Sequence, residues 1–368
     1  MRFQGERRRF NREISRDGTR WTHLLPGVAA AMAMVALACF PACCRILAQT
    51  TPENPIPPIG KLVDIGGRRL HLNCSGEGSP TVVLETGARH FSLAWALVQP
   101  GVASFTRVCS YDRAGYAWSD AGPEPRTMAQ IVFELHALLA AAGEKGPYVM
   151  AGEAMGGAIV RTFAAQYPKD VAGMVLVESV HEDDQIFVNE KMFRLRETAQ
   201  KREIPAVKTS LETPAERETL VWKTTKVAAY PPGDPRSKLP PDLQRIWLVA
   251  RKQDKYNFAA NSEFAYLPEE MEKLHAETAA DPQPLGKKPL IVLTREVAFD
   301  RAAGGIQPAE LERGREDRQA QLARLSANSK LIIVKNSGHD IYLDQPQAVV
   351  DAIHQVVESA RAGTALPQ

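Results

Sequence analysis

The stretch YVMAGEAMGGAIV, residues 148–160, decides the fold of this chain. It begins with a short apolar run that is typical of a buried strand, and it ends in a helical pattern. Between them, Gly152 and Gly156 flank Ala154, and Gly157 follows. Small residues around a central position predict a sharp strand-to-helix turn, because a strained, exposed residue leaves its neighbours little room for side chains.

A turn of the form G-x-S-x-G is a nucleophile elbow, in which the central serine attacks the substrate. The central residue here is Ala154. A methyl group cannot attack a carbonyl carbon, so covalent catalysis through this position is excluded for the chain as written. Glu153 is adjacent, but neighbouring residues on a turn point in different directions, and we do not expect it to substitute for serine.

Composition narrows the class of protein. The chain has 368 residues, of which 44% are hydrophobic, so it can bury a large core. The formal net charge of +2 gives no overall field that would attract nucleic acid, and we expect a small-molecule substrate instead. The histidines show no metal-ligand spacing, and we expect no metal and no cofactor.

Residues 1–48 predict an export signal or a membrane anchor. Arginines crowd residues 7–20, and an uncharged, apolar stretch follows at residues 24–44. This order is typical of secretory leaders, and the stretch is long enough to span a bilayer. We expect an exported protein, periplasmic or membrane-anchored. A start codon assigned too far upstream is the alternative.

The remaining chain predicts an α/β fold with a mostly parallel sheet. Residues 49–60 form a proline-rich linker. Apolar runs then alternate with helical patterns over residues 61–180 and 289–368, which we take as the two parts of one core. Residues 181–288 break the alternation and predict a helical lid over the carboxyl ends of the strands.

The expected elements can be listed by residue number. We expect a hairpin at 62–74, strands at 81–85, 107–111, 148–150, 171–177, 289–294 and 330–334, and helices from Thr127 to Gly143, at 155–166, at about 310–325 and at 346–358.

These segments together resemble the α/β-hydrolase superfamily. The resemblance is carried by the turn at Ala154, by the stretch YDRAGYAWSD at residues 111–120, and by Ser337-Gly338-His339 after the last expected strand. It covers residues 61–358. It implies a mostly parallel eight-stranded sheet with helices on both faces and a helical lid.

The resemblance implies that His339 is the general base. A group with a pKa of about 6.5 can take and return a proton at neutral pH. The acid that orients it has two candidate positions. We favour Glu178, where the haloalkane dehalogenase branch has its acid. The alternative follows the penultimate strand, at Asp300 or Glu296.

The resemblance also implies an oxyanion hole made of two backbone N–H groups. The first belongs to Met155, directly after the nucleophile position. The second belongs to Ala88, in the loop after the third strand. Arg89 and His90 follow in that loop, facing either the pocket or solvent.

The strand order of the superfamily makes the second and fourth strands neighbours. Cys74 ends one of these strands and Cys109 lies in the other. A disulfide forms between them if the compartment is oxidising, and two buried thiols are the alternative.

The implied function is that of a serine hydrolase acting on a small or medium ester-like substrate. Three explanations account for Ala154. It is a deliberate Ser→Ala change in an active hydrolase, or the chain is a natural pseudoenzyme that binds a small molecule, or His339 drives a reaction without a covalent step.

Overall fold

The computed structural model describes residues 55–188, 191–199, 219–220, 229–298 and 308–367. They belong to one unit of the chain, Pro52–Gln368. The expected export segment, the first half of the linker and Asp300 lie outside the described residues. Among the helices that are described, none has the length and apolarity to cross a membrane.

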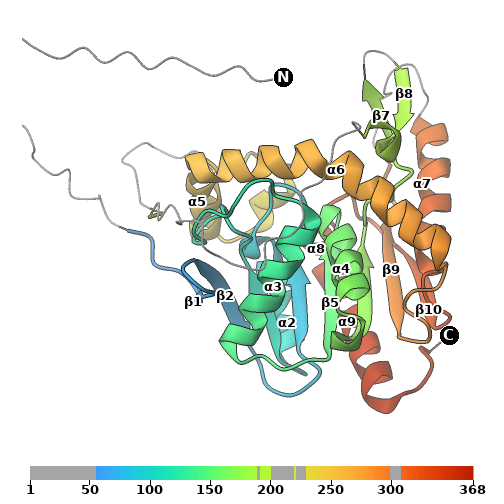
Figure 1. Ribbon diagram of the computed structural model, residues 1–368, viewed down its shortest axis with the longest axis horizontal. Coiled ribbons are helices and arrows are strands. Elements are labelled where there is room, and N and C mark those ends of the chain that lie inside the picture. Colours follow the sequence, from blue (N-terminus) through green and yellow to red (C-terminus); the bar gives the residue numbers. More distant parts are fainter. Residues whose placement is uncertain (1–54, 189–190, 200–218, 221–228, 299–307, 368) are drawn as a thin grey trace, which may run out of the picture. The chain divides into compact units, whose positions relative to one another are not determined.

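Eight strands form the central sheet: β1 (Lys61–Asp64), β2 (Arg69–Ser75), β3 (Val82–Glu85), β4 (Val108–Tyr111), β5 (Tyr148–Glu153), β6 (Val171–Val177), β9 (Leu290–Arg295) and β10 (Ser329–Val334). Their order is β1-β2-β4-β3-β5-β6-β9-β10 (Figure 1). β2 is antiparallel to both neighbours, and every pair from β4 to β10 is parallel. The predicted fold class is confirmed.

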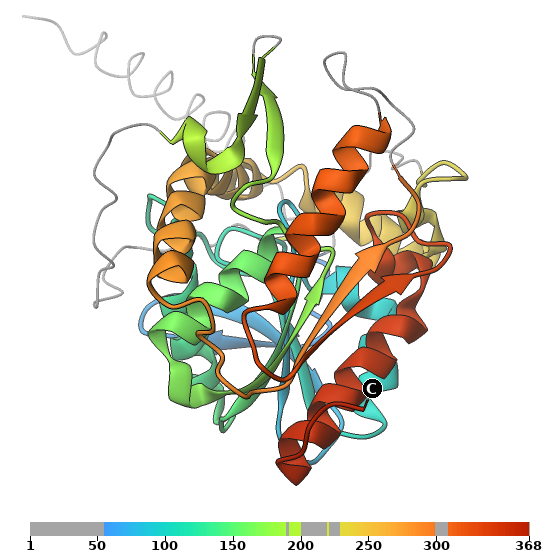
Figure 2. The same ribbon diagram turned by 90° about the vertical axis from the view of Figure 1, so that its right-hand side faces the viewer.

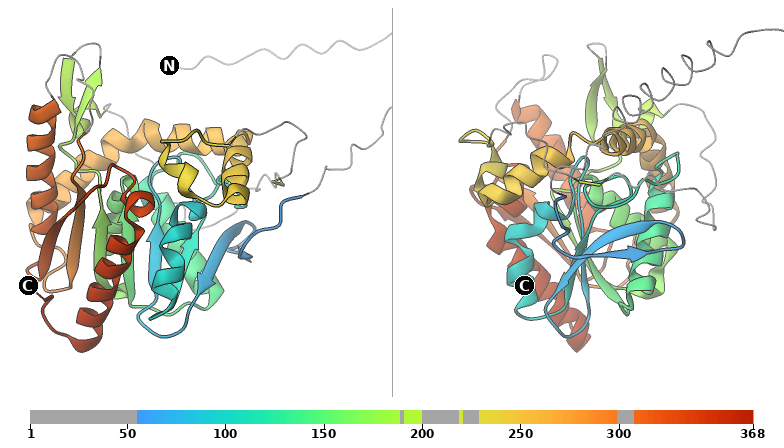
Figure 3. Two further views of the ribbon diagram at one scale, coloured as in Figure 1. Left: turned by 180° about the vertical axis from the view of Figure 1, so that it is seen from behind. Right: turned by 90° about the vertical axis from the view of Figure 1, so that its left-hand side faces the viewer.

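Helices cover both faces of the sheet (Figure 2). One face is covered by α3 (Met128–Ala142), α4 (Met155–Gln166) and α7 (Pro308–Ala323). The other face is covered by η1 (Ser92–Leu97), α2 (Gln99–Ala103), α8 (Ile341–Asp344) and α9 (Pro346–Ala362), which are in front in the left view of Figure 3. Successive strand residues therefore enter different cores, as Met150 and Ala151 of β5 do.

Local signals set the helix ends that the sequence predicted. The side chain of Thr127 accepts a hydrogen bond from the Gln130 N–H at the start of α3. The helix ends at Gly143, whose φ of 78° is left-handed and therefore suits glycine.

The insertion at residues 181–288 connects β6 to β9. It follows η2 (Pro168–Asp170) and β6, and it contains η3 (Leu195–Thr198), η4 (Pro235–Lys238), α5 (Pro241–Ala250) and α6 (Asp254–Ala280). It also contains a hairpin of β7 (Gln185–Val188) and β8 (Lys191–Arg194), which the sequence analysis missed. Because these short strands pair with each other outside the central sheet, they lack the pattern of core strands.

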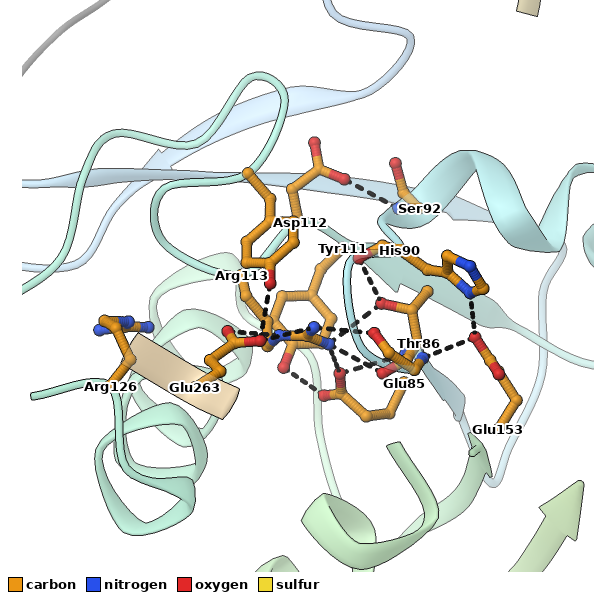
Figure 4. A network of polar contacts seen from close by, with 12 residues as sticks. Glu85, Thr86, His90, Ser92, Tyr111, Asp112, Arg113, Arg126, Glu153 and Glu263 are labelled. Carbon is orange, nitrogen blue, oxygen red and sulfur yellow. Dashed lines mark hydrogen bonds and ion pairs between the residues drawn. The ribbon is translucent and has the colours of Figure 1, made fainter. Parts of the chain in front are cut away.

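Buried charges fix α6 to the core. The Arg113 guanidinium, in the loop after β4, contacts Glu263 of α6 at 3.0 Å and Glu85 of β3 at 2.7 Å (Figure 4). All three side chains are at most 2% exposed. A buried charge is costly without a partner, so this cluster ties the insertion to the sheet.

A disulfide joins β2 to β4. Cys74 and Cys109 face each other in the antiparallel register, and their sulfur atoms are bonded. The bridged alternative, rather than two free thiols, is therefore the one that the structure contains.

Candidate active site

Ala154 lies on a strained turn between β5 and α4. Its φ of 47° is in the left-handed region, which residues with a Cβ atom seldom adopt. The Ala154 N–H donates to the Val177 carbonyl at 3.1 Å, and the Ala154 carbonyl accepts from Val180 at 3.0 Å and from Gly157 at 3.1 Å. The side chain is partly exposed. The predicted strand-to-helix turn is confirmed.

The glycines around this turn are required by close backbone contacts. A Cβ atom on Gly156 would lie 2.6 Å from the Thr86 carbonyl oxygen and 2.7 Å from that of Glu85. A Cβ atom on Gly152 would lie 2.4 Å from the Gly156 carbonyl oxygen. The spacing seen in the sequence therefore allows the turn to pack against the loop after β3.

Arg113 sets the orientation of that loop. Its guanidinium donates to the carbonyl oxygens of Thr86 at 2.8 Å and Gly87 at 2.9 Å. In a trans peptide the N–H points away from the preceding C=O. The N–H groups of Gly87 and Ala88 therefore point away from Arg113, and the Gly87 N–H donates to Glu153 at 2.6 Å.

Met155 supplies a second N–H beside the turn. It is the first residue of α4, and the first N–H groups of a helix have no acceptor within the helix. The positive end of the helix dipole adds to their attraction for negative charge. Met155 and Ala88 thus lie on the two segments that meet at Ala154.

Glu153 is the site residue that the sequence analysis undervalued. Its carboxylate is 2% exposed and accepts hydrogen bonds from the Gly87 N–H at 2.6 Å and from His90 Nδ1 at 2.7 Å (Figure 4). Burial opposes ionisation of Glu153, but His90, His339 and the Gly87 N–H outweigh it and hold the pKa below its ordinary value. The site therefore contains a buried anion beside Ala154.

His339 lies in the segment between β10 and α8, as the sequence predicted, and is half-buried. Its charge acts on Glu153, so it lies near the residue that precedes Ala154. The structure thus brings the first and last parts of the core together at one edge of the sheet.

His90 is held by residues from three other elements. Its Nδ1 atom lies 2.7 Å from Glu153 and 3.2 Å from the hydroxyl of Tyr342 on α8. Trp247 of α5 packs edge-on against the imidazole, with 5.5 Å between ring centroids. The Tyr342 hydroxyl donates to Asp340 at 3.2 Å.

The candidate acid Glu178 contacts arginines. Arg295 donates to it from Nη1 at 2.7 Å and from its backbone N–H at 2.8 Å. Thr294 and Arg315 add contacts at 3.0 and 3.4 Å. Within the described residues, no hydrogen bond or ion pair joins Glu178 to His339.

The other candidate acids differ in position. Glu296 is a surface residue that binds Lys335 at 2.6 Å and the Asn336 N–H at 2.9 Å. Asp300 lies outside the described residues.

Known proteins share this fold. The profile described as "Alpha/beta hydrolase family" matches residues 82–352. A thermophilic esterase from Thermogutta terrifontis superposes with a TM-score of 0.53 at 19% identity, covering 85% of this chain and 99% of that chain. A putative epoxide hydrolase from Pseudomonas aeruginosa gives 0.54 at 16%, covering 83% and 99%. At these identities the solved structures show the fold alone.

Two curated relatives differ in how much of them is matched. A Gibberella zeae protein named as an AB hydrolase superfamily protein is 25% identical over 302 residues, 77% of this chain and 87% of that protein. A probable transporter from Hormonema carpetanum, efuK, is 33% identical over 129 residues, 33% of this chain. That match spans only 18% of the length of the transporter.

Proposed function

Because the chain belongs to the alpha/beta hydrolase family, we propose that it is built as a serine-esterase-type hydrolase in which Ala154 occupies the nucleophile position. One observation carries the proposal: the left-handed turn at Ala154 lies next to a carboxylate whose pKa is lowered partly by His339. The backbone geometry of a nucleophile is thus kept beside a histidine, although the hydroxyl is missing.

The roles follow from this geometry. A hydroxyl at position 154 gives its proton to His339 while its oxygen attacks the carbonyl carbon of an ester. The N–H groups of Met155 and Ala88 stabilise the oxyanion that forms. His339 then returns the proton to the departing alkoxide. Without the hydroxyl, such sites retain only about 10³–10⁴-fold catalysis over water.

The identity of the acid is a separate part of the proposal. Glu178 and Asp300 are both candidates. The oxygens of Glu178 already accept from Arg295, Thr294 and Arg315. A carboxylate that already accepts from these three donors interacts less strongly with an imidazolium ion. This favours Asp300→Asn over Glu178→Gln as the variant that lowers kcat.

The insertion supports a lid role and a small or medium apolar substrate group. Trp247 packs on His90, which belongs to the loop beside Ala154. Binding sites for such groups are lined mainly by apolar and aromatic side chains. The Cys74–Cys109 bridge supports export, because disulfides persist in oxidising compartments.

The test is Ala154→Ser, assayed on p-nitrophenyl esters beside the chain as given. We expect a gain in kcat/KM of about 10³-fold or more, because the missing nucleophile is restored to a formed site. The gain should disappear in Ala154→Ser/His339→Ala. Ala165→Ser, on the exposed side of the same helix, is the matched control and should give no gain.

The opposite outcome points to another class of protein. If Ala154→Ser gains nothing while the chain binds a small molecule tightly, the hydrolase proposal fails and the pseudoenzyme explanation holds. A His339-dependent reaction without a covalent step is the second candidate function, favoured by the effect of His339 on the pKa of Glu153, the residue before Ala154.

A further inference from the structure

The chain as written contains a carboxylate–histidine pair beside the position where the nucleophile is missing. Resting on the proposed function, we propose that His90, oriented by Glu153, is a general base that activates water for direct hydrolysis of an ester-like substrate. Four observations carry this step: the hydrogen-bond pattern of His90, its exposure, its position, and its contrast with the other histidine–carboxylate pairs.

The hydrogen bonds of His90 assign its tautomer. Glu153 carries a lowered pKa and is an acceptor at neutral pH, so Nδ1 of His90 donates to it. The Tyr342 hydroxyl donates its own proton to Asp340, so its oxygen faces Nδ1 as an acceptor too. With the proton on Nδ1, the lone pair is on Nε2, the atom a general base needs.

The side chains of Glu153 and His90 differ in their exposure to solvent, as a general base and its orienting carboxylate do. The Glu153 side chain is 2% exposed, whereas that of His90 is 18% exposed. The buried carboxylate fixes the ring and stabilises the imidazolium ion, and the exposed part of the His90 side chain can contact a water molecule. Glu153 is thus a positioning residue and His90 the residue that touches the reacting water.

The pair is also in the right place. His90 belongs to the loop that carries Ala88, and Glu153 directly precedes Ala154. A carbonyl group whose oxygen approaches the N–H groups of Ala88 and Met155 therefore lies near the loop that carries His90. A base on this loop does not require a hydroxyl at position 154.

Two other histidine–carboxylate pairs in the described residues lack this combination. His71 and Asp112 are 0% exposed, and Nε2 of His71 accepts from the Gly60 N–H at 3.2 Å, so no lone pair is left for water. His136 and Asp170 are more than a third exposed, and the His136 ring stacks against Tyr167. These two pairs provide structural and surface comparisons for His90.

The reaction balances with water as the only co-reactant. The lone pair of the water oxygen forms a bond to the carbonyl carbon while its proton passes to Nε2 of His90. The C=O electron pair becomes the oxyanion held by the two N–H groups. When it re-forms the carbonyl, the bond to the alkoxide breaks, and the alkoxide takes the proton from His90. An acid and an alcohol leave, and no acyl-enzyme forms.

The first experiment measures p-nitrophenyl acetate hydrolysis by the chain as given and by His90→Gln. The glutamine amide keeps a hydrogen bond to Glu153 but cannot take a proton. We expect a loss of about 10²-fold or more, the usual contribution of a general base. His90→Ala should show the same loss, and added imidazole should restore part of the rate. His136→Ala is the matched control and should keep the full rate.

The second experiment tests Glu153 by separating kcat from KM. A carboxylate at hydrogen-bond distance holds the His90 ring in the tautomer with its proton on Nδ1 and stabilises the imidazolium ion as it forms. Glu153→Gln should therefore lower kcat while KM and the urea midpoint stay unchanged, whereas Glu153→Asp should recover part of the lost kcat. A purely structural role would lower the urea midpoint, and Glu153→Asp would then not recover kcat.

A third comparison separates this proposal from the proposed function. In the Ala154→Ser chain, His339→Ala should cost more activity than His90→Gln, with a burst that reports an acyl-enzyme. In the chain as given, the order should reverse and the burst should be absent. If Ala154→Ser restores activity but His90→Gln does not change the rate of the original chain, the proposed role of His90 is wrong. The proposed hydrolase function then still holds. If the serine restores nothing but His90→Gln still lowers the rate of the chain as given, the serine-esterase proposal fails while the role of His90 stands.

Discussion

The turn at Ala154 is held by groups that do not include its side chain. Its backbone bonds with Val177, Val180 and Gly157 fix the chain direction. The glycines at 152 and 156 allow the close approach to the loop after β3. Because none of these contacts needs a hydroxyl, alanine or serine at position 154 leaves the same backbone. This is why the backbone can form this strained turn with alanine at its centre.

At the residue scale, Glu178 gives a stability prediction. Glu178→Gln removes a carboxylate charge that the buried guanidinium groups of Arg295 and Arg315 both contact, and removing one partner of a buried pair is strongly destabilising. We expect the free energy of unfolding to fall by about 3 kcal/mol, measured by urea denaturation.

Glu296→Gln is the control for this prediction. Glu296 also binds a cation, Lys335, but the pair lies on the surface, where solvent screens it. We expect no measurable change in the urea midpoint. Equal effects of the two substitutions would contradict the stabilising role of Glu178.

At the scale of elements, helix α6 carries a buried acid that responds to pH. Glu270 is 3% exposed, and burial raises its pKa to about 7 against the opposing charge of Lys273 and a hydrogen bond from the Met128 backbone. The folded state therefore binds a proton that the unfolded state has already released. The docking of α6 near the start of α3 is thus coupled to protonation.

The sign of this coupling predicts a loss of stability with rising pH. The contribution of Glu270 is fully present below about pH 4.5, the unfolded pKa, and is lost as the pH rises through about 7. The shift corresponds to about 3 kcal/mol. Glu270→Gln should remove this slope and raise the free energy of unfolding at pH 8.

Denaturant titrations at several pH values measure this effect. Glu272→Gln is the control, because this neighbour on α6 is half exposed and pairs with Arg196 on the surface. It should leave the pH dependence unchanged. A pH profile for Glu270→Gln that matches the original chain would show that the acid does not titrate in this range.

At the scale of the whole molecule, the Cys74–Cys109 bridge restricts the conformations that the unfolded chain can adopt. It closes a loop with a sequence separation of 35 residues, and chain entropy assigns such a loop about 3–4 kcal/mol. Cys74→Ala/Cys109→Ala should lower the free energy of unfolding by about this amount.

A reductant provides the check on the disulfide prediction. Dithiothreitol should lower the urea midpoint of the original chain toward that of the double variant, and it should have no effect on the variant itself. An original chain that is indifferent to reductant, with two thiols that alkylate before reduction, would rule out the bridge.

The sequence by itself determined the elements and much of their order. Apolar runs marked the strands, Thr127 and Gly143 marked the ends of α3, and the glycines around Ala154 marked the turn. These signals are local: they depend on backbone geometry, capping and the period of hydrophobic residues. The hairpin of β7 and β8 escaped because it is paired outside the main sheet.

Only the tertiary structure decided which charged groups meet. The sequence favoured Glu178 over Asp300 as the acid, and only the fold shows that the Glu178 carboxylate contacts Arg295 and Arg315. The sequence predicted no role for Glu153, whereas in the fold its carboxylate accepts hydrogen bonds from the Gly87 N–H and from His90. The physical reason is that such pairs join segments far apart in the chain. Their geometry depends on how strands and loops come together, and no local pattern of residues records it.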